Sequence, residues 1–83
     1  MSKSLLQIPV KTTAERVKYM MEELQITKQS EFGVLCGASR ALVNHWVTGR
    51  TKQIDPIYAF DLEDKTPFSA RWILLGTGNP LKK

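Results

Sequence analysis

The sequence predicts an all-α domain built from five helices. Three observations lead to this prediction. Apolar residues recur with the 3.6-residue period of a helix, no segment alternates with the two-residue period of a strand, and helix-capping residues recur along the chain. With 83 residues, 42% of them hydrophobic and 24% charged, the chain has the length and composition of one small globular domain.

The first helix is expected over residues 13–25. Thr12 and Glu15 have the spacing of a capping box, in which each side chain accepts a hydrogen bond from a free backbone N–H at the helix start. The apolar residues that follow the helical period, and are therefore expected to be buried, are Ala14, Val17, Met20, Met21 and Leu24. The exposed face is expected to carry Arg16, Lys18, Glu22 and Glu23.

Two short helices are expected next, separated by three or four residues that include a glycine. Thr27 is the expected cap of the first, which runs to about residue 35. Ser39 is the expected cap of the second, which ends near Thr48, with Gly49 in the position that closes many helices in a left-handed conformation. Two short helices joined in this way form a helix-turn-helix arrangement.

The last two helices are placed by their caps. Asp55 followed by Pro56 is a common pair at a helix start, so a helix is expected from there to a point before Pro67. Ser69 is the expected cap of a final helix over residues 70–75, which Gly76 closes.

These elements divide the chain into three parts. Residues 1–11 are expected to form an N-terminal arm, because Pro9 discourages a helix there. Residues 12–76 form the helix-turn-helix domain, and residues 77–83 form a tail that is expected to be frayed.

The single cysteine excludes several classes of site. Cys36 has no partner for an internal disulfide, and one cysteine with one histidine is too few for a cysteine-based zinc site. It is expected to be a small buried apolar residue in a cytoplasmic protein. The apolar stretch near the start of the chain is too short for a signal-peptide core or a membrane span.

The positive charge is unevenly distributed. The chain has a net charge of +4, and residues 1–54 carry eight basic and four acidic side chains, whereas residues 55–83 carry four of each. The excess therefore lies in the first two-thirds of the chain, which suits a polyanionic partner.

The helix-turn-helix segment resembles regulators of the lambda repressor and Cro type. In that family a glutamine opens the second helix, a small residue stands at the fifth position and a glycine at the ninth, and Gln29, Gly33 and Gly37 match these positions. The apolar positions of the motif are matched by Phe32, Cys36, Ala38, Val43 and Trp46. The later segment SARWILLG, which begins at Ser69, resembles the Ser-x-x-Trp-apolar-Leu-x-Gly ending of phage and prophage repressors.

The resemblance implies a sequence-specific transcriptional regulator in a bacterial cell or a phage-infected host. Such a protein binds a near-palindromic double-stranded DNA operator as a homodimer, here with residues 39–48 in the major groove. No cofactor, metal, membrane or small-molecule substrate is expected. The residues that the resemblance assigns to DNA binding are Lys28, Gln29, Ser39, Arg40, Ala41, Leu42, Asn44, His45, Thr48, Arg50 and Lys52.

Several of these residues have a specific expected role. Arg40 can donate two hydrogen bonds to O6 and N7 of guanine. Gln29 would contact a phosphate and brace the recognition helix, and His45 would read guanine or reach a phosphate. Leu42 would contact a thymine methyl or pack against the preceding helix. The residues suited to phosphates are Thr48, Arg50 and Lys52.

Self-association is expected through the last helix, with Trp72, Ile73 and Leu74 as candidate interface residues. Ile73 and Leu74 are expected to point away from a core that contains Trp72 and Leu75.

Two positions depart from the family pattern. Pro67 replaces the usual glycine and should hold Thr66 in an extended conformation. Thr27 stands one residue earlier than the usual cap.

The sequence also bears on two other functional classes. An antitoxin or anti-repressor that binds a protein partner through the same fold remains an alternative. An enzyme is not expected, because the sequence has no phosphate-binding loop, metal-ligand cluster or paired nucleophile and base.

Overall fold

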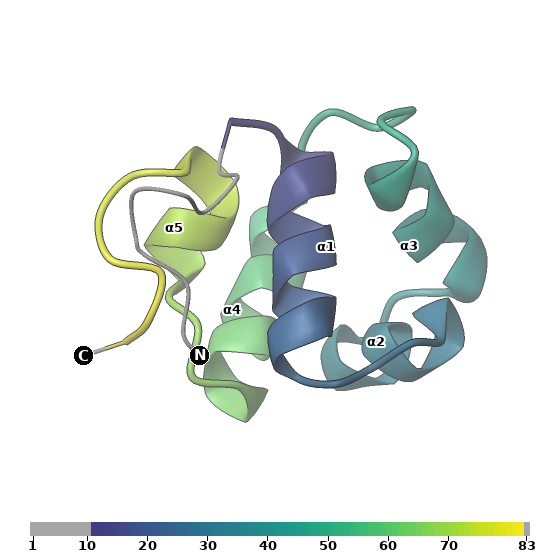
Figure 1. The fold of residues 1–83 in the computed structure, drawn as a ribbon, viewed down its shortest axis with the longest axis horizontal. Coiled ribbons are helices and arrows are strands. Elements are labelled where there is room, and N and C mark those ends of the chain that lie inside the picture. Colours follow the sequence, from purple (N-terminus) through teal and green to yellow (C-terminus); the bar gives the residue numbers. More distant parts are fainter. Residues whose placement is uncertain (1–10, 83) are drawn as a thin grey trace.

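The computed structural model describes residues 11–82, and these residues form five helices (Figure 1). The helices are α1 (Thr13–Glu23), α2 (Gln29–Cys36), α3 (Arg40–Val47), α4 (Pro56–Lys65) and α5 (Ala70–Leu75). Apart from one isolated bridge, no β-structure occurs in residues 11–82, so the all-α prediction is confirmed. Residues 1–10 of the predicted arm, and Lys83, lie outside the described residues.

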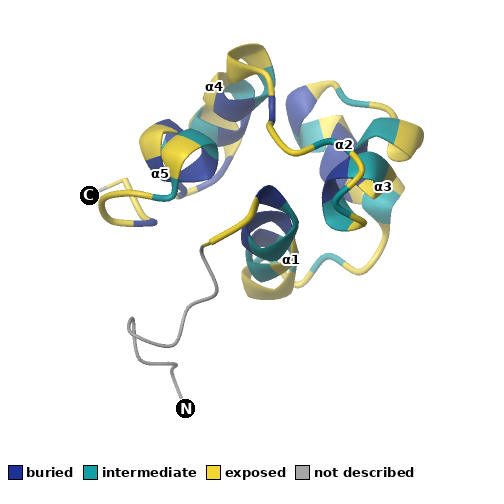
Figure 2. Ribbon diagram, turned by 90° about the horizontal axis from the view of Figure 1, so that it is seen from above, coloured by how far each residue is buried: buried dark blue, intermediate teal, exposed yellow. Residues whose placement is uncertain are grey.

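The core lies where the five helices meet. α1 packs against α3 and α5, α2 packs against α3 and α4, and α4 packs against α5. Figure 2 shows the buried residues of each helix turned toward its neighbours. The largest fully buried side chains are Trp46, Trp72, Phe32, Phe68, Met20, Leu62 and Ile73.

The start of α1 follows the prediction, but its exposed face does not. The Thr12 and Glu15 side chains form the capping box, and the helix ends before Gln25, whose φ of 60° is left-handed. Arg16, expected on the exposed face, is only 6% exposed. Its Nε donates a 3.0 Å hydrogen bond to the carbonyl oxygen of Ile73 at the end of α5. The prediction was wrong because α5 covers this side of α1.

α2 begins at Gln29, one residue later than a cap at Thr27 would predict. Lys28, rather than Thr27, occupies the cap position, and no side chain caps the helix. The Thr27 prediction was therefore wrong. Gly37 closes α2 with a φ of 74°, as the turn requires. The predicted Ser39 cap of α3 is confirmed, since its Oγ accepts a hydrogen bond from the Leu42 N–H at 3.1 Å.

The caps of α4 and α5 lie where they were predicted. Asp55 and Pro56 occupy the N-cap and first position of α4, although the Asp55 carboxylate makes no capping bond. Thr66 ends α4 in an extended conformation before Pro67, with φ −136° and ψ 168°. Ser69 accepts a hydrogen bond from Trp72 N–H, which fixes the start of α5.

The tail is packed against the start of α5, which contradicts the prediction of a frayed end. Phe68 and Leu81 form an antiparallel bridge. Ser69 N–H donates to the Pro80 carbonyl at 2.8 Å, and Lys82 N–H donates to the Pro67 carbonyl at 2.7 Å. Pro80 is buried by this arrangement. The tail therefore packs against residues 67–69, the segment that connects α4 and α5.

Candidate nucleic-acid interface

The backbones of α2 and the turn before α3 approach very closely at Gly33. A Cβ atom built at Gly33 would lie 2.3 Å from the Ala38 carbonyl oxygen and 3.4 Å from a methyl group of Val43. The first distance is far inside van der Waals contact, so no side chain fits without moving the turn. Gly33 thus sets the distance between α2 and α3, and even the methyl group of an alanine would force a shift there.

α3 is held to the core by one face and exposes the other. Val43 and Trp46 are at most 1% exposed. The Trp46 ring also packs edge-on against Tyr58 of α4, with 5.6 Å between ring centroids. The opposite face presents a row of exposed residues with polar and small side chains, interrupted by the half-buried His45. The exposed members of this row are Arg40, Ala41, Asn44 and Thr48.

A hydrogen bond links the exposed face of α3 to the start of α2. Nδ2 of Asn44 donates to Oε1 of Gln29 at 3.2 Å. The predicted bracing contact between Gln29 and α3 is therefore present, and Asn44 is its partner. Sequence reasoning missed this pairing because the two residues are fifteen positions apart and no periodicity connects them.

Leu42 lies on the border between the exposed face and the core. It is half-buried and packs against the core cluster. It also lines a small hollow with Trp46 and Tyr58, on the side of the segment that follows α3. This packing accounts for an apolar residue next to the polar row.

The uncapped start of α2 lies beside the start of α3. A hollow of about 360 Å³ is lined by Thr27, Lys28, Gln29, Ser30 and Arg40. Lys28 and Arg40 are exposed cations, and the hollow contains no acidic lining residue. The first N–H groups of a helix carry partial positive charge, so this hollow is electropositive. It was not anticipated from the sequence, because it depends on how the two helices meet.

The segment after α3, residues 48–53, adds two exposed cations to those of the hollow. Gly49 takes a φ of 82°, and Arg50 and Lys52 are exposed. Two hydrogen bonds fix this segment: Thr51 N–H donates to the His45 carbonyl at 3.1 Å, and the Thr13 hydroxyl donates to the Lys52 carbonyl at 2.7 Å. The second bond ties the segment to the start of α1.

The candidate self-association residues on α5 are placed differently from the prediction. Trp72 and Ile73 are at most 1% exposed, because they pack into the protein's own core. They offer no surface to a partner, so their assignment to an interface was wrong. Leu74 is half-buried, whereas Leu75, expected in the core, is 62% exposed.

Burial also sets the properties of Cys36. Cys36 is 1% exposed, and desolvation raises the pKa of its thiol, with a smaller opposing effect from a backbone hydrogen bond of Ala38. This placement agrees with the expectation of a buried apolar residue.

Residues 11–82 contain no cluster of potential metal ligands. None of the helices in that range has the length and hydropathy needed to span a membrane. Comparison of the chain with protein families, curated proteins and solved structures gave no significant match.

Proposed function

We propose that this protein is a sequence-specific regulator of transcription that binds double-stranded DNA through α3, as repressors of the lambda and Cro type do. The observation that carries the proposal is the orientation of α3. Val43 and Trp46 fix one face in the core, and the opposite face presents Arg40, Ala41 and Asn44 to solvent. The DNA major groove is wide enough to admit a helix that is exposed in this way.

The surroundings of α3 support the same proposal. The hollow at the start of α2 brings Lys28 and Arg40 together without acidic lining residues. At the other end of α3, Arg50 and Lys52 are exposed. A duplex lying along α3 would place its phosphates near both groups, and phosphate contacts supply much of the affinity and its salt dependence.

Homodimerisation is part of the proposal, because two copies are needed to read the two halves of a near-palindromic operator. The contact surface between two copies must be formed by apolar side chains that are exposed in the single chain. Ile57 and Phe60 are 66% and 55% exposed and lie one turn apart on α4. These two residues replace Trp72 and Ile73 as the proposed contact between copies.

The same exposed pair is what favours the second candidate function, an antitoxin or anti-repressor that binds a protein partner. Exposed apolar side chains on adjacent turns suit a protein interface of either kind. Many antitoxins that resemble this family also bind DNA, so a toxin gene of similar size beside this one is the observation that would favour the second function.

Selection of binding sites from random duplex DNA, performed at two salt concentrations, tests the proposal. We expect enrichment of a near-palindrome and an affinity that falls steeply as salt rises. Arg40→Ala should abolish the enrichment at one position of each half-site. Arg71→Ala removes the same charge from an exposed position on α5 and is the matched control. Binding without any enriched sequence would reject the proposal.

A further inference from the structure

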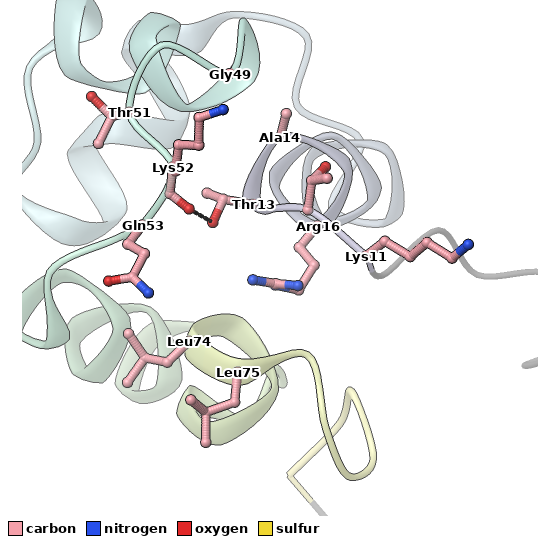
Figure 3. Close-up of a pocket in the computed structure, with 11 residues that line it drawn as sticks. Lys11, Thr13, Ala14, Arg16, Gly49, Thr51, Lys52, Gln53, Leu74 and Leu75 are labelled. Atoms are coloured by element: carbon pink, nitrogen blue, oxygen red, sulfur yellow. Dashed lines mark hydrogen bonds between the residues drawn. The ribbon is translucent and has the colours of Figure 1, made fainter.

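A buried threonine at the start of α1 is bonded to the exposed segment that follows α3. Thr13 is 4% exposed, and its hydroxyl donates the 2.7 Å hydrogen bond to the Lys52 carbonyl that Figure 3 shows as a dashed line. The two residues are 39 positions apart in the sequence. Valine has a similar shape and carries no polar group, whereas burial of a hydroxyl costs free energy unless the hydroxyl is hydrogen-bonded. The hydroxyl at this position is therefore explained by its contact with Lys52 and not by the packing of α1 alone.

The backbone of Lys52 is held on both sides by hydrogen bonds to different helices. On its N-terminal side, the Thr51 N–H donates to the His45 carbonyl of α3 at 3.1 Å. On its C-terminal side, the carbonyl of Lys52 itself accepts the bond from Thr13 of α1. The buried side chain of Ile54, 3% exposed, follows two residues later. The position of Lys52 relative to α3 is thus fixed before any partner binds.

The side chain of Lys52 is directed toward the α3 side of this segment. Figure 3 shows it turned toward Gly49, two residues beyond the end of α3, and away from Leu74 and Leu75 of α5. Lys52 is also exposed. Its ammonium group is therefore accessible to a partner that lies along α3.

We propose that Thr13 is a positioning residue for DNA binding. Without touching DNA, it holds Lys52 where the ammonium group can contact a phosphate of a duplex that lies along α3. The inference rests on the proposed function and adds a residue of α1 to it. A lysine on a fixed backbone loses less conformational entropy on contact than a lysine on a mobile segment. Because phosphate contacts carry no sequence information directly, the Thr13 hydroxyl contributes to affinity and not to base preference.

Arg50, the other exposed cation of the segment, provides an internal comparison. The backbone hydrogen bonds on either side of it are made by the N–H groups of Gly49 and Thr51, and both lead to carbonyl groups of α3. Removal of the Thr13 hydroxyl should therefore weaken the contact of Lys52 and spare that of Arg50. General destabilisation of the domain would not distinguish between the two cations.

Double-mutant cycles of DNA affinity, measured on the selected site at one salt concentration and at a temperature where all variants are folded, test the proposal. Thr13→Val should weaken binding about fivefold, with the base preference unchanged, and Thr13→Ser, which keeps the hydroxyl, should bind like the unchanged chain. In the Lys52→Ala background, Thr13→Val should have no further effect. In the Arg50→Ala background, the full loss should remain.

Thr66→Val is the matched control. Thr66 is 6% exposed, and its hydroxyl also donates to a backbone carbonyl, that of Leu62 in α4 at 2.6 Å. Thr66→Val therefore makes the same chemical change at a similarly buried position, and it should leave DNA affinity unchanged. Thr13→Ala removes the same hydroxyl as Thr13→Val and serves if that variant does not fold.

Backbone amide relaxation of the free protein tests the same link without DNA. The order parameters of residues 51–53 should fall in Thr13→Val and stay unchanged in Thr66→Val. Unchanged order in Thr13→Val, or an equal loss of affinity with and without Lys52, would overturn the inference. If the unchanged chain binds DNA and Thr13→Val binds equally well, only this inference is wrong. If the unchanged chain does not bind DNA, the proposed function fails, and this inference fails with it.

Discussion

The side-chain amide of Asn44 donates a 3.2 Å hydrogen bond to Oε1 of Gln29, so a residue of the α3 surface is oriented by the first residue of α2. This bond uses one N–H of Asn44. The Oδ1 atom and the second N–H remain, and these are the acceptor and donor that adenine requires at N6 and N7. Under the proposed function, we therefore expect Asn44 to read adenine.

Asn44→Ala should relax the preference for adenine at one position of each half-site, at a cost of about 1–3 kcal/mol in binding. Gln29→Ala should weaken the same preference, because it releases the Asn44 amide. The two changes should be strongly non-additive when binding is measured on the selected site and on single-base variants. Val34→Ala, at a position of α2 that is 78% exposed and does not line the hollow beside Gln29, is the control. Additive losses would show that the hydrogen bond does not orient Asn44 on DNA.

Arg40 and Lys52 should differ in the kind of loss that they cause. Arg40→Ala should lower affinity by about 1–3 kcal/mol on sites with the preferred guanine and have little effect where that base is replaced. Lys52→Ala should weaken binding to all sequences similarly and reduce the salt slope by about one unit. Fluorescence anisotropy at several salt concentrations distinguishes the two patterns. Uniform loss from both changes would place Arg40 on a phosphate.

Gly33 and Gly37 should respond differently to alanine. Gly33→Ala places a Cβ 2.3 Å from the Ala38 carbonyl and should lower the free energy of unfolding by about 2–3 kcal/mol. Gly37→Ala meets no atom within 4 Å, and its cost comes only from the φ of 74°, about 1 kcal/mol. Urea denaturation of both variants measures the difference. Equal losses would mean that the turn adjusts freely to a side chain at Gly33.

Burial of Cys36 predicts a loss of stability at alkaline pH. Because desolvation raises the pKa of the folded thiol, the unfolded chain releases this proton first as pH increases. The unfolded state then binds fewer protons, so the free energy of unfolding falls as pH rises past the ordinary thiol pKa of about 8.5. Cys36→Ala should remove this part of the pH dependence. Urea denaturation measured from about pH 7 to about pH 10, on both sides of the ordinary thiol pKa, tests this. An unchanged slope would assign the effect to other groups.

Phe60→Asp should disrupt self-association if copies meet through α4. A charge placed beside Ile57 would have to be desolvated in the interface, which is strongly unfavourable. Sedimentation velocity should show a shift toward the monomer for Phe60→Asp and no shift for Leu75→Asp, a similar change at another exposed apolar residue. A shift for Leu75→Asp and none for Phe60→Asp would instead indicate that copies meet at the end of α5.

Local sequence signals predicted most helix starts, with Thr27 the exception, and they failed where distant segments meet. The capping box of Thr12 and Glu15 and the Ser39 and Ser69 caps are each formed within four residues, so the sequence contains all the information they need. Arg16 lies on the helix face opposite several apolar residues, yet α5 covers it and its carbonyl partner is 57 residues away. The helical period alone does not say which neighbours a helix will have.

The same reason explains the errors in α5 and the tail. Six residues of helix give too short a pattern to choose between Ile73 and Leu75 as the buried residue, and the docking against α1 and α4 decided it. The tail contains Gly78 and Pro80, which predict irregular backbone correctly but not its packing. Its hydrogen bonds to Pro67 and Ser69 depend on a turn more than ten residues earlier.

The packing of the tail has a practical consequence for labelling the molecule. Lys82 is tied to Pro67, and Figure 1 shows this end of the chain on the side of the molecule away from α3. A fluorophore or affinity handle joined there would project away from α3, the helix that the proposed function places against DNA. The C-terminal side is thus a suitable attachment point for immobilising the protein on a biosensor surface with α3 left accessible.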